Sequence, residues 1–222
     1  MGTEEIFIDA IKDGNLAQVE LLLAQHPDLL QHELPGGLSP ALLAMYYNEP
    51  EVAQLLVQRG APLDIFAASG CGALGQVQAL VEAEPGLVEA VAADGFQPLG
   101  LAAFFGQVEV VRFLLEHEAT VDSPSRNPMR VMPLHSAAAN RHLEICRLLL
   151  EHGAPVNAAQ ADDFTPLHQA AQNGQLELVR LLLDYEAYVN AHKADGQTPL
   201  ALAIQHGHPE VVELLKRRGA VQ

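Results

Sequence analysis

Hydrophobic positions in this chain recur with helical spacing, in pairs of stretches separated by a glycine. The clearest apolar stripe has i, i+3, i+4 spacing and consists of Leu176, Val179, Leu182 and Leu183. A shorter stretch before it carries the small residues Ala170 and Ala171, and Gly174 lies between the two. Because alanines let helices approach closely, the pattern predicts two short antiparallel helices joined by a tight turn.

This unit repeats at regular intervals along the chain, marked by the evenly spaced Pro133, Pro166 and Pro199. Pro166 suits the first turn of a helix, where its missing N–H costs nothing, and Thr165 before it is a natural N-cap. Self-similarity at a fixed period of this length indicates stacked supersecondary units. We therefore expect one elongated domain over residues 1–222.

The unit resembles the ankyrin repeat. The resemblance rests on the motif Thr165-Pro166-Leu167-His168-x-Ala170-Ala171-x-x-Gly174, followed by the leucine-rich stretch 176–183 and by Val189-Asn190. It implies a mostly α-helical solenoid of stacked helix-turn-helix units joined by β-hairpin-like loops. We expect units at about 4–36, 37–64, 65–93, 94–122, 123–157, 158–190 and 191–222, the first and last being caps.

A second, longer period relates the segment 7–64 to the segment 65–122, so the first half reads as a duplicated two-repeat module. No turn signature lies at the seam, Leu63-Asp64-Ile65. We expect a short connection there, without the projecting hairpin. The segment 123–131 contains two prolines and two arginines and is expected to form a longer exposed hairpin or loop.

The formal charge is −16 and it is uneven. Residues 1–111 hold 15 acidic and two basic residues, whereas residues 112–222 hold 13 acidic and ten basic ones. A field of this sign repels phosphate backbones and favours a basic partner region, so nucleic acid is a poor partner. The first residues do not resemble a signal peptide and no apolar run could span a bilayer, so we expect a cytoplasmic protein without membrane contact.

The sequence offers little for catalysis. His135 and His168 occupy the motif position, where the resemblance implies hydrogen bonds to neighbouring backbone. Cys71 lies next to Gly72 in a stretch that superficially resembles a nucleophile elbow, but helix is expected on both sides of it. We expect no enzymatic activity, no cofactor and no metal site.

The resemblance places the partner-facing positions in the turn before each Thr-Pro motif and in the two residues before each inter-helix glycine. These positions are Leu38, Tyr46, Tyr47, Phe96, Phe104, Phe105, Val131, Asn140, Phe164, Gln172, Asn173, Gln197, Gln205 and His206. Six of the chain's 11 Phe and Tyr residues lie there. At the spacing of packed helices, the pairs Tyr46-Tyr47 and Phe104-Phe105 are expected roughly 20 Å apart.

These positions predict an interaction module that binds another protein through a concave, aromatic-rich face. Acidic residues expected at hairpin tips would select a basic partner region: Asp94, Asp162, Asp163 and Asp195. An alternative is a regulatory or inhibitory subunit that occludes a partner enzyme. We expect a monomer, with weak self-association through the same face as a further alternative.

Overall fold

The computed structural model describes residues 2–32, 34 and 37–221, which contain fourteen α-helices and three short 3₁₀ helices. The α-helices are α1 (Thr3–Lys12), α2 (Leu16–Gln25), α3 (Pro40–Tyr46), α4 (Pro50–Gln58), α5 (Ile65–Cys71), α6 (Leu74–Ala83), α7 (Pro98–Phe105), α8 (Val108–Glu116), α9 (Pro133–Ala139), α10 (Leu143–Glu151), α11 (Pro166–Gln172), α12 (Leu176–Asp184), α13 (Pro199–Gln205) and α14 (Pro209–Arg217). The 3₁₀ helices are η1 (Pro27–Gln31), η2 (Pro85–Glu89) and η3 (Ala161–Asp163). The mostly α-helical solenoid predicted from the sequence is confirmed.

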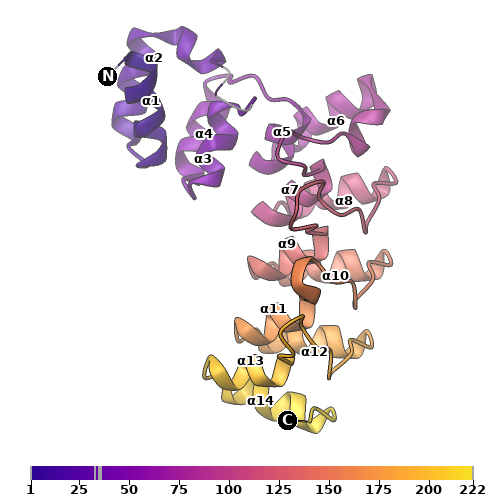
Figure 1. Cartoon of the computed structure of the whole chain (residues 1–222). Coiled ribbons are helices and arrows are strands. Elements are labelled where there is room, and N and C mark those ends of the chain that lie inside the picture. Colours follow the sequence, from indigo (N-terminus) through magenta and orange to yellow (C-terminus); the bar gives the residue numbers. More distant parts are fainter. Residues whose placement is uncertain (1, 33, 35–36, 222) are drawn as a thin grey trace.

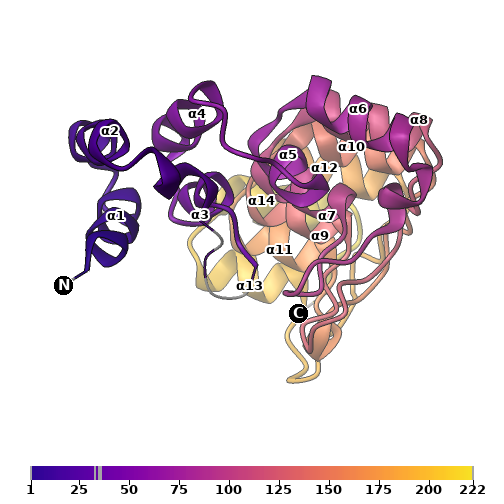
Figure 2. The ribbon, with the colours of Figure 1, turned by 90° about the horizontal axis from the view of Figure 1, so that it is seen from above.

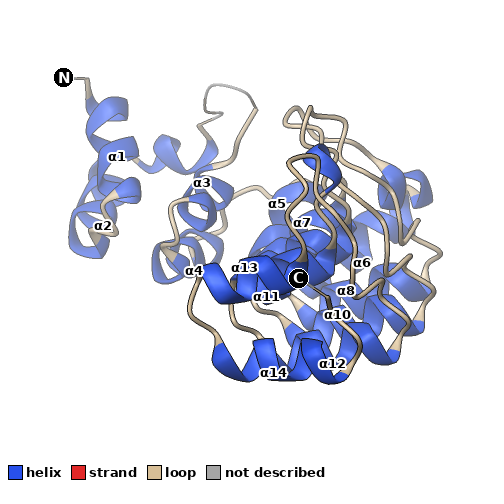
Figure 3. Ribbon diagram, turned by 60° about the horizontal axis from the view of Figure 1, so that its bottom comes forward, coloured by secondary structure: helices blue, strands red, loops and turns tan. Residues whose placement is uncertain are grey.

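The helices form two rows. Odd-numbered helices pack on one another as an inner row, and even-numbered helices form an outer row (Figure 1). The loops that precede inner helices project together to one side (Figure 3). We call the surface formed by the C-terminal ends of the inner helices and by these loops the inner face; it corresponds to the concave face expected from the sequence.

Local signals fix where the inner helices begin. Pro166 opens α11 in a capping box, in which Thr165 Oγ1 accepts from His168 N–H and the backbone N–H of Thr165 donates to His168 Nδ1. Ser39 and Thr198 cap α3 and α13 with the side-chain bond alone, accepting from Leu42 N–H and Ala201 N–H. The histidine ring of the motif also ties repeats together, because His168 Nε2 donates to the carbonyl oxygen of Gln197 at 3.2 Å. His135 makes the equivalent bond to Ala158 at 3.1 Å, so the predicted structural role of both histidines is confirmed.

The duplication in the first half is visible in the elements. The 3₁₀ helices η1 and η2 begin at Pro27 and Pro85, one copy of the longer period apart. Helices α2 and α6 are related by the same shift along the sequence, and so are α3 and α7. The segment 125–131 forms the predicted longer hairpin, closed by a hydrogen bond from Ser125 N–H to the carbonyl oxygen of Val131.

The connection between α4 and α5 differs from the others. Residues 59–64 link the two helices directly and form no hairpin, as the sequence predicted. The buried side chains fall into two clusters, one extending from Phe7 to Ala61 and the other from Ile65 to Leu215. Figures 1 and 2 show α1–α4 set to one side of the column formed by α5–α14. The array therefore bends at this junction.

A side-chain hydrogen bond that joins the later repeats is also missing at the junction between α4 and α5. In later repeats the side chain of the residue before the outer helix bonds to a carbonyl oxygen in the inner helix of the previous repeat. These bonds join Gln107 to Gly70, His142 to Phe104, Gln175 to Ala138 and His208 to Gln172. Before α6 this residue is Ala73, whose side chain cannot make such a bond. Helix α4 packs against α2 and also contacts the inner helix α5, whereas its contact with α6 is weaker than those between other neighbouring outer helices. No helix among the described residues is long and apolar enough to span a bilayer.

Candidate partner-binding surface

Three aromatic rings meet on the inner face. Tyr46 ends α3, whereas Phe104 and Phe105 end α7. The Phe105 ring lies edge-on to Tyr46, with centroids 5.3 Å apart, and edge-on to Phe104, with centroids 4.9 Å apart. Edge-to-face pairs of this kind are favourable because the positive ring edge meets the negative face. We call these three residues the aromatic cluster.

The wide separation expected between the two aromatic pairs is wrong for Tyr46 and Phe105, whose rings are in contact. Helix α5 lies between α3 and α7, and at the contact it carries Gly70 instead of a side chain. A Cβ atom at Gly70 would lie 2.8 Å from Leu42 Cδ1 and 3.2 Å from Phe105 Cδ2. The absent side chain lets rings from two non-adjacent inner helices touch across the junction.

The cluster borders a pocket of about 420 Å³. Its wall combines the three rings and Met45 with polar groups from a later repeat, Asn140 and His142. Tyr46 is 36% exposed, and Phe104 and Phe105 are half-buried. The rings are therefore packed on one another but still open to solvent on one side.

The hydroxyl of Tyr46 donates to Asp94 Oδ2 at 2.5 Å. Burial raises the pKa of Tyr46 far above its usual value of 10, and the hydrogen bond to Asp94 and the charge of that carboxylate raise it further. The phenol thus stays protonated and holds the hairpin that precedes α7 against the end of α3.

The other predicted aromatic positions lie apart from the cluster. Tyr47 is 48% exposed, and the Lys12 ammonium lies 5.3 Å from its ring centroid. Phe96 is half-buried and packs near Gly100. Phe164 is half-buried between the Lys193 ammonium, 5.7 Å from its ring centroid, and the His168 ring. Each is accessible to some degree, but none continues the row of touching rings.

The C-terminal part of the inner face is polar. Asn140, Gln205 and His206 are exposed, whereas Val131, Gln172, Asn173 and Gln197 are half-buried. Amide side chains bond to neighbouring groups here: Asn173 Nδ2 donates to the carbonyl oxygen of Ala139, and Gln197 Nε2 donates to Gln205 Oε1. This part offers hydrogen-bonding groups in place of apolar anchors.

The four acidic positions lie in projecting turns and are all exposed. Asp162 and Asp163 adopt positive φ angles of 60° and 55°. Asp195 forms an ion pair with Lys193 Nζ at 3.1 Å. The pKa of Asp195 is lowered by hydrogen bonding from the Gln197 backbone and by Lys193. Asp94 and the pair Asp162–Asp163 keep carboxylates that form no ion pair among the described residues.

Cys71 is the last residue of α5 and is half-buried. It packs against the N-terminal core cluster, and burial together with the Asp64 carboxylate raises its thiol pKa to about 12. Since the thiolate is the nucleophilic form, this environment disfavours nucleophilic attack by Cys71 at neutral pH. Among residues 2–32, 34 and 37–221, no three His, Cys, Asp or Glu side chains form a group that could hold a metal ion.

Sequence reasoning missed the residues that reach back between repeats, Gln107, His142, Gln175 and His208. A signal existed, because a long polar side chain stands directly before the outer helix in each of these repeats. It also missed Gly70, which makes room for the contact between Tyr46 and Phe105. Small residues are common in the inner helices, so a glycine there does not stand out in the sequence.

A comparison with protein families matches the model described as ankyrin repeats (3 copies) to residues 65–160 and 157–221. The match begins at the first residue of α5, at the bend between the two core clusters. A search of curated proteins found no match for the chain. The matched residues cover more than half of the sequence, and the chain belongs to the ankyrin repeat family.

Proposed function

We propose that the chain binds a partner protein through its inner face, with the aromatic cluster as the anchor. Ankyrin repeats are generally protein–protein interaction modules, and the family is typically non-enzymatic. The observation that carries the choice of surface is the contact of Tyr46, Phe104 and Phe105, which stay partly exposed beside an open pocket.

The energetic argument starts from the exposed rings. Aromatic side chains bury a large area and lose few rotamers when they bind, which is why they dominate interface energetics. The inner row is already packed with alanine and leucine, so the stack does not need these rings on its surface. Burial of the Tyr46 and Phe104 rings by a partner would contribute on the order of 2 kcal/mol each.

Charge supports a basic region in that partner. Residues 1–111, which hold Tyr46 and both phenylalanines of the cluster, carry a formal charge of −13. Such a field speeds the approach of a basic surface and weakens as salt is added. Asp94 lies at the edge of the cluster, where a lysine or arginine of the partner would meet its carboxylate.

The test is affinity capture from a lysate of the source cells with the wild-type chain and with the double variant Tyr46→Ala, Phe104→Ala. The matched control is Tyr185→Ala, Tyr188→Ala, which removes two exposed tyrosines just beyond the end of the outer helix α12. We expect one stoichiometric partner that the wild type and the control retain and the cluster variant loses. Equal retention by all three chains would refute the surface.

The same captured complex separates the regulatory alternative from a scaffold. If the partner is an enzyme, its activity is measured with increasing amounts of the chain. A fall in activity that follows occupancy supports occlusion of its site, and unchanged activity supports scaffolding.

A further inference from the structure

The projecting hairpins are joined to one another by backbone hydrogen bonds. The N–H of Arg126 donates to the carbonyl oxygen of Gly95 at 2.8 Å, that of Ala161 to Met129 at 3.0 Å and that of Ala194 to Asp162 at 2.9 Å. In each case the donor directly follows the residue whose N–H closes its own hairpin. Each hairpin thus presents one outward donor to the hairpin before it.

The corresponding donor in the hairpin before α7 has no partner within the described part of the chain. Ala92 closes this hairpin by donating to the carbonyl oxygen of Phe96 at 2.9 Å, so the equivalent outward donor is Ala93 N–H. Among the described residues Ala93 N–H donates to no backbone or side-chain acceptor. The hairpin that would accept it is the one missing between α4 and α5, and Ala93 is exposed.

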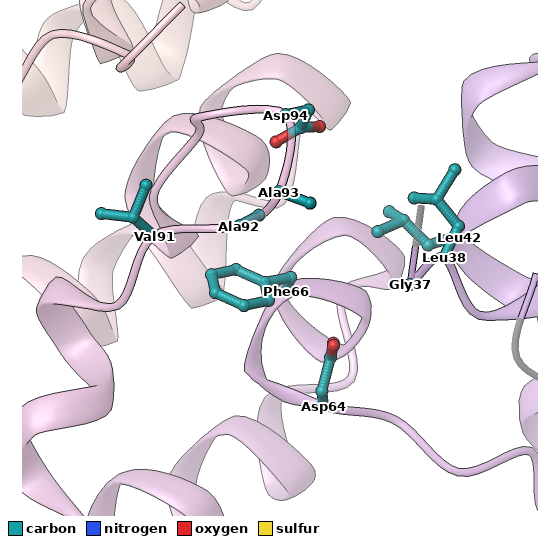
Figure 4. Close-up of a pocket in the computed structure, with 9 residues that line it drawn as sticks. All are labelled: Gly37, Leu38, Leu42, Asp64, Phe66, Val91, Ala92, Ala93 and Asp94. Atoms are coloured by element: carbon teal, nitrogen blue, oxygen red, sulfur yellow. The ribbon is translucent and has the colours of Figure 1, made fainter. Parts of the chain in front are cut away.

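A pocket of about 480 Å³ lies where that hairpin would stand. Leu38 and Leu42 face Phe66 across it, and Ala93 lines its rim (Figure 4). The carboxylates of Asp64 and Asp94 lie on either side of Phe66 in this view. We call this pocket, lined by Leu38, Leu42, Asp64, Phe66, Ala93 and Asp94, the junction gap.

The two carboxylates of the junction gap have no cationic partner among the described residues. Asp64 caps α5 by accepting from Ala67 N–H, and Asp94 accepts from Tyr46 and from Phe96 N–H. Neither forms an ion pair with a described residue. A carboxylate has about four acceptor positions, so both keep capacity for a cationic donor.

We propose that the junction gap binds an extended turn of a partner protein that carries an apolar side chain next to a lysine or arginine. The turn takes the place of the missing hairpin and accepts the hydrogen bond of Ala93 N–H, as an added strand does at a sheet edge. Its apolar side chain lies between Leu42 and Phe66, and its cation lies beside Asp64 and Asp94. The inference shares with the proposed function the premise that the chain binds a protein and the carboxylate of Asp94, whereas Asp64, Phe66 and Ala93 belong to the junction gap alone.

The probe is a phage-displayed library of seven-residue peptides closed by a disulfide, selected on the full chain. Affinities of the enriched peptides are then measured by fluorescence anisotropy against the wild type and single variants. Ala93→Pro removes the donor and suits the turn, because Ala93 is the second residue of a four-residue turn closed by Gly95 N–H, a position that favours proline. Asp64→Asn removes a charge but keeps an N-cap side chain.

We expect enriched peptides with an apolar residue next to Lys or Arg. Their affinity should fall about tenfold on Ala93→Pro and on Asp64→Asn, and should be unchanged on Phe104→Ala. Circular dichroism and the thermal midpoint serve to show that each variant is folded.

Three outcomes overturn the proposal: no enrichment, binding that both gap variants leave unchanged, or binding that only Phe104→Ala abolishes. The last result would leave the proposed inner-face function standing. A concentration-dependent dimer in light scattering that Ala93→Pro abolishes would overturn the stated occupant, because a second copy of the chain would then fill the gap.

Discussion

The hydroxyl of Tyr46 donates to the carboxylate of Asp94, 48 residues away in sequence, at an O···O distance of 2.5 Å. The bond runs from the end of α3 to the turn before α7 and so crosses the point where the array bends. At this junction the stack has neither a hairpin nor a side chain that reaches back from the start of the outer helix. The Tyr46–Asp94 bond and the adjoining ring contact therefore replace connections that the later repeats make elsewhere.

Replacing Tyr46 by Phe tests this role. The variant keeps the ring against Phe105 but removes the hydrogen bond, and we expect the free energy of unfolding to fall by about 1 kcal/mol. Urea denaturation gives the value, with Tyr188→Phe, at an exposed tyrosine, as the control. An unchanged denaturation midpoint would mean that the bond adds nothing across the junction.

Tyr46→Phe should also change the dependence of stability on alkaline pH. The pKa of Tyr46 in the folded chain is raised above its unfolded value of 10, so the unfolded state ionises first as pH rises. The wild type should lose stability above pH 10 more steeply than Tyr46→Phe. Parallel curves for the two chains would contradict the raised pKa.

The buried His135 should make the free energy of unfolding depend on pH in the acid range as well. Burial lowers its pKa from 6.5 to about 4, although hydrogen bonds to backbone carbonyls act in the opposite direction. The stability that depends on neutral His135 is complete above pH 6.5 and is lost as pH falls toward 4, by up to about 3 kcal/mol. Urea denaturation between pH 7 and 4 measures it, and His135→Gln should flatten the curve in that range. His168 contributes in the same direction, because burial lowers its pKa too.

The sequence predicts most of the helices and turns because each repeat carries its own signals for helix starts and turns. Thr165 and Pro166 mark a helix start and Gly174 marks a turn, and the missing turn signature at residues 63–65 correctly predicts a connection without a hairpin. The approach of Tyr46 to Phe105 was not predictable from the spacing, because that estimate assumes a straight stack of equal steps. Gly70 lets the two rings meet, and this effect depends on packing across repeats.

Ala73→Gln should repair the junction in part. Gln107 and Gln175 occupy the same position before α8 and α12. Each donates to a carbonyl oxygen in the inner helix of the previous repeat. Ala73 borders a pocket of about 410 Å³ with Met45, near the end of α3, so a longer side chain has room. We expect a gain of about 1 kcal/mol in the free energy of unfolding. Ala79→Gln, at an exposed position of α6, is the control and should leave stability unchanged.

The two core clusters predict unequal stability along the array. In stacked repeats each unit is stabilised by its neighbours, so a weak interface divides the stack into parts that open separately. The cluster from Phe7 to Ala61 is the smaller one and meets the rest mainly through α3 and α5. Hydrogen exchange followed by mass spectrometry should show faster exchange in α2 and α4 than in α10 and α12, by tenfold or more. Ala73→Gln should slow exchange in α4 and leave α12 as it is, whereas uniform protection from α2 to α12 in the wild type would show that the stack opens as a single unit.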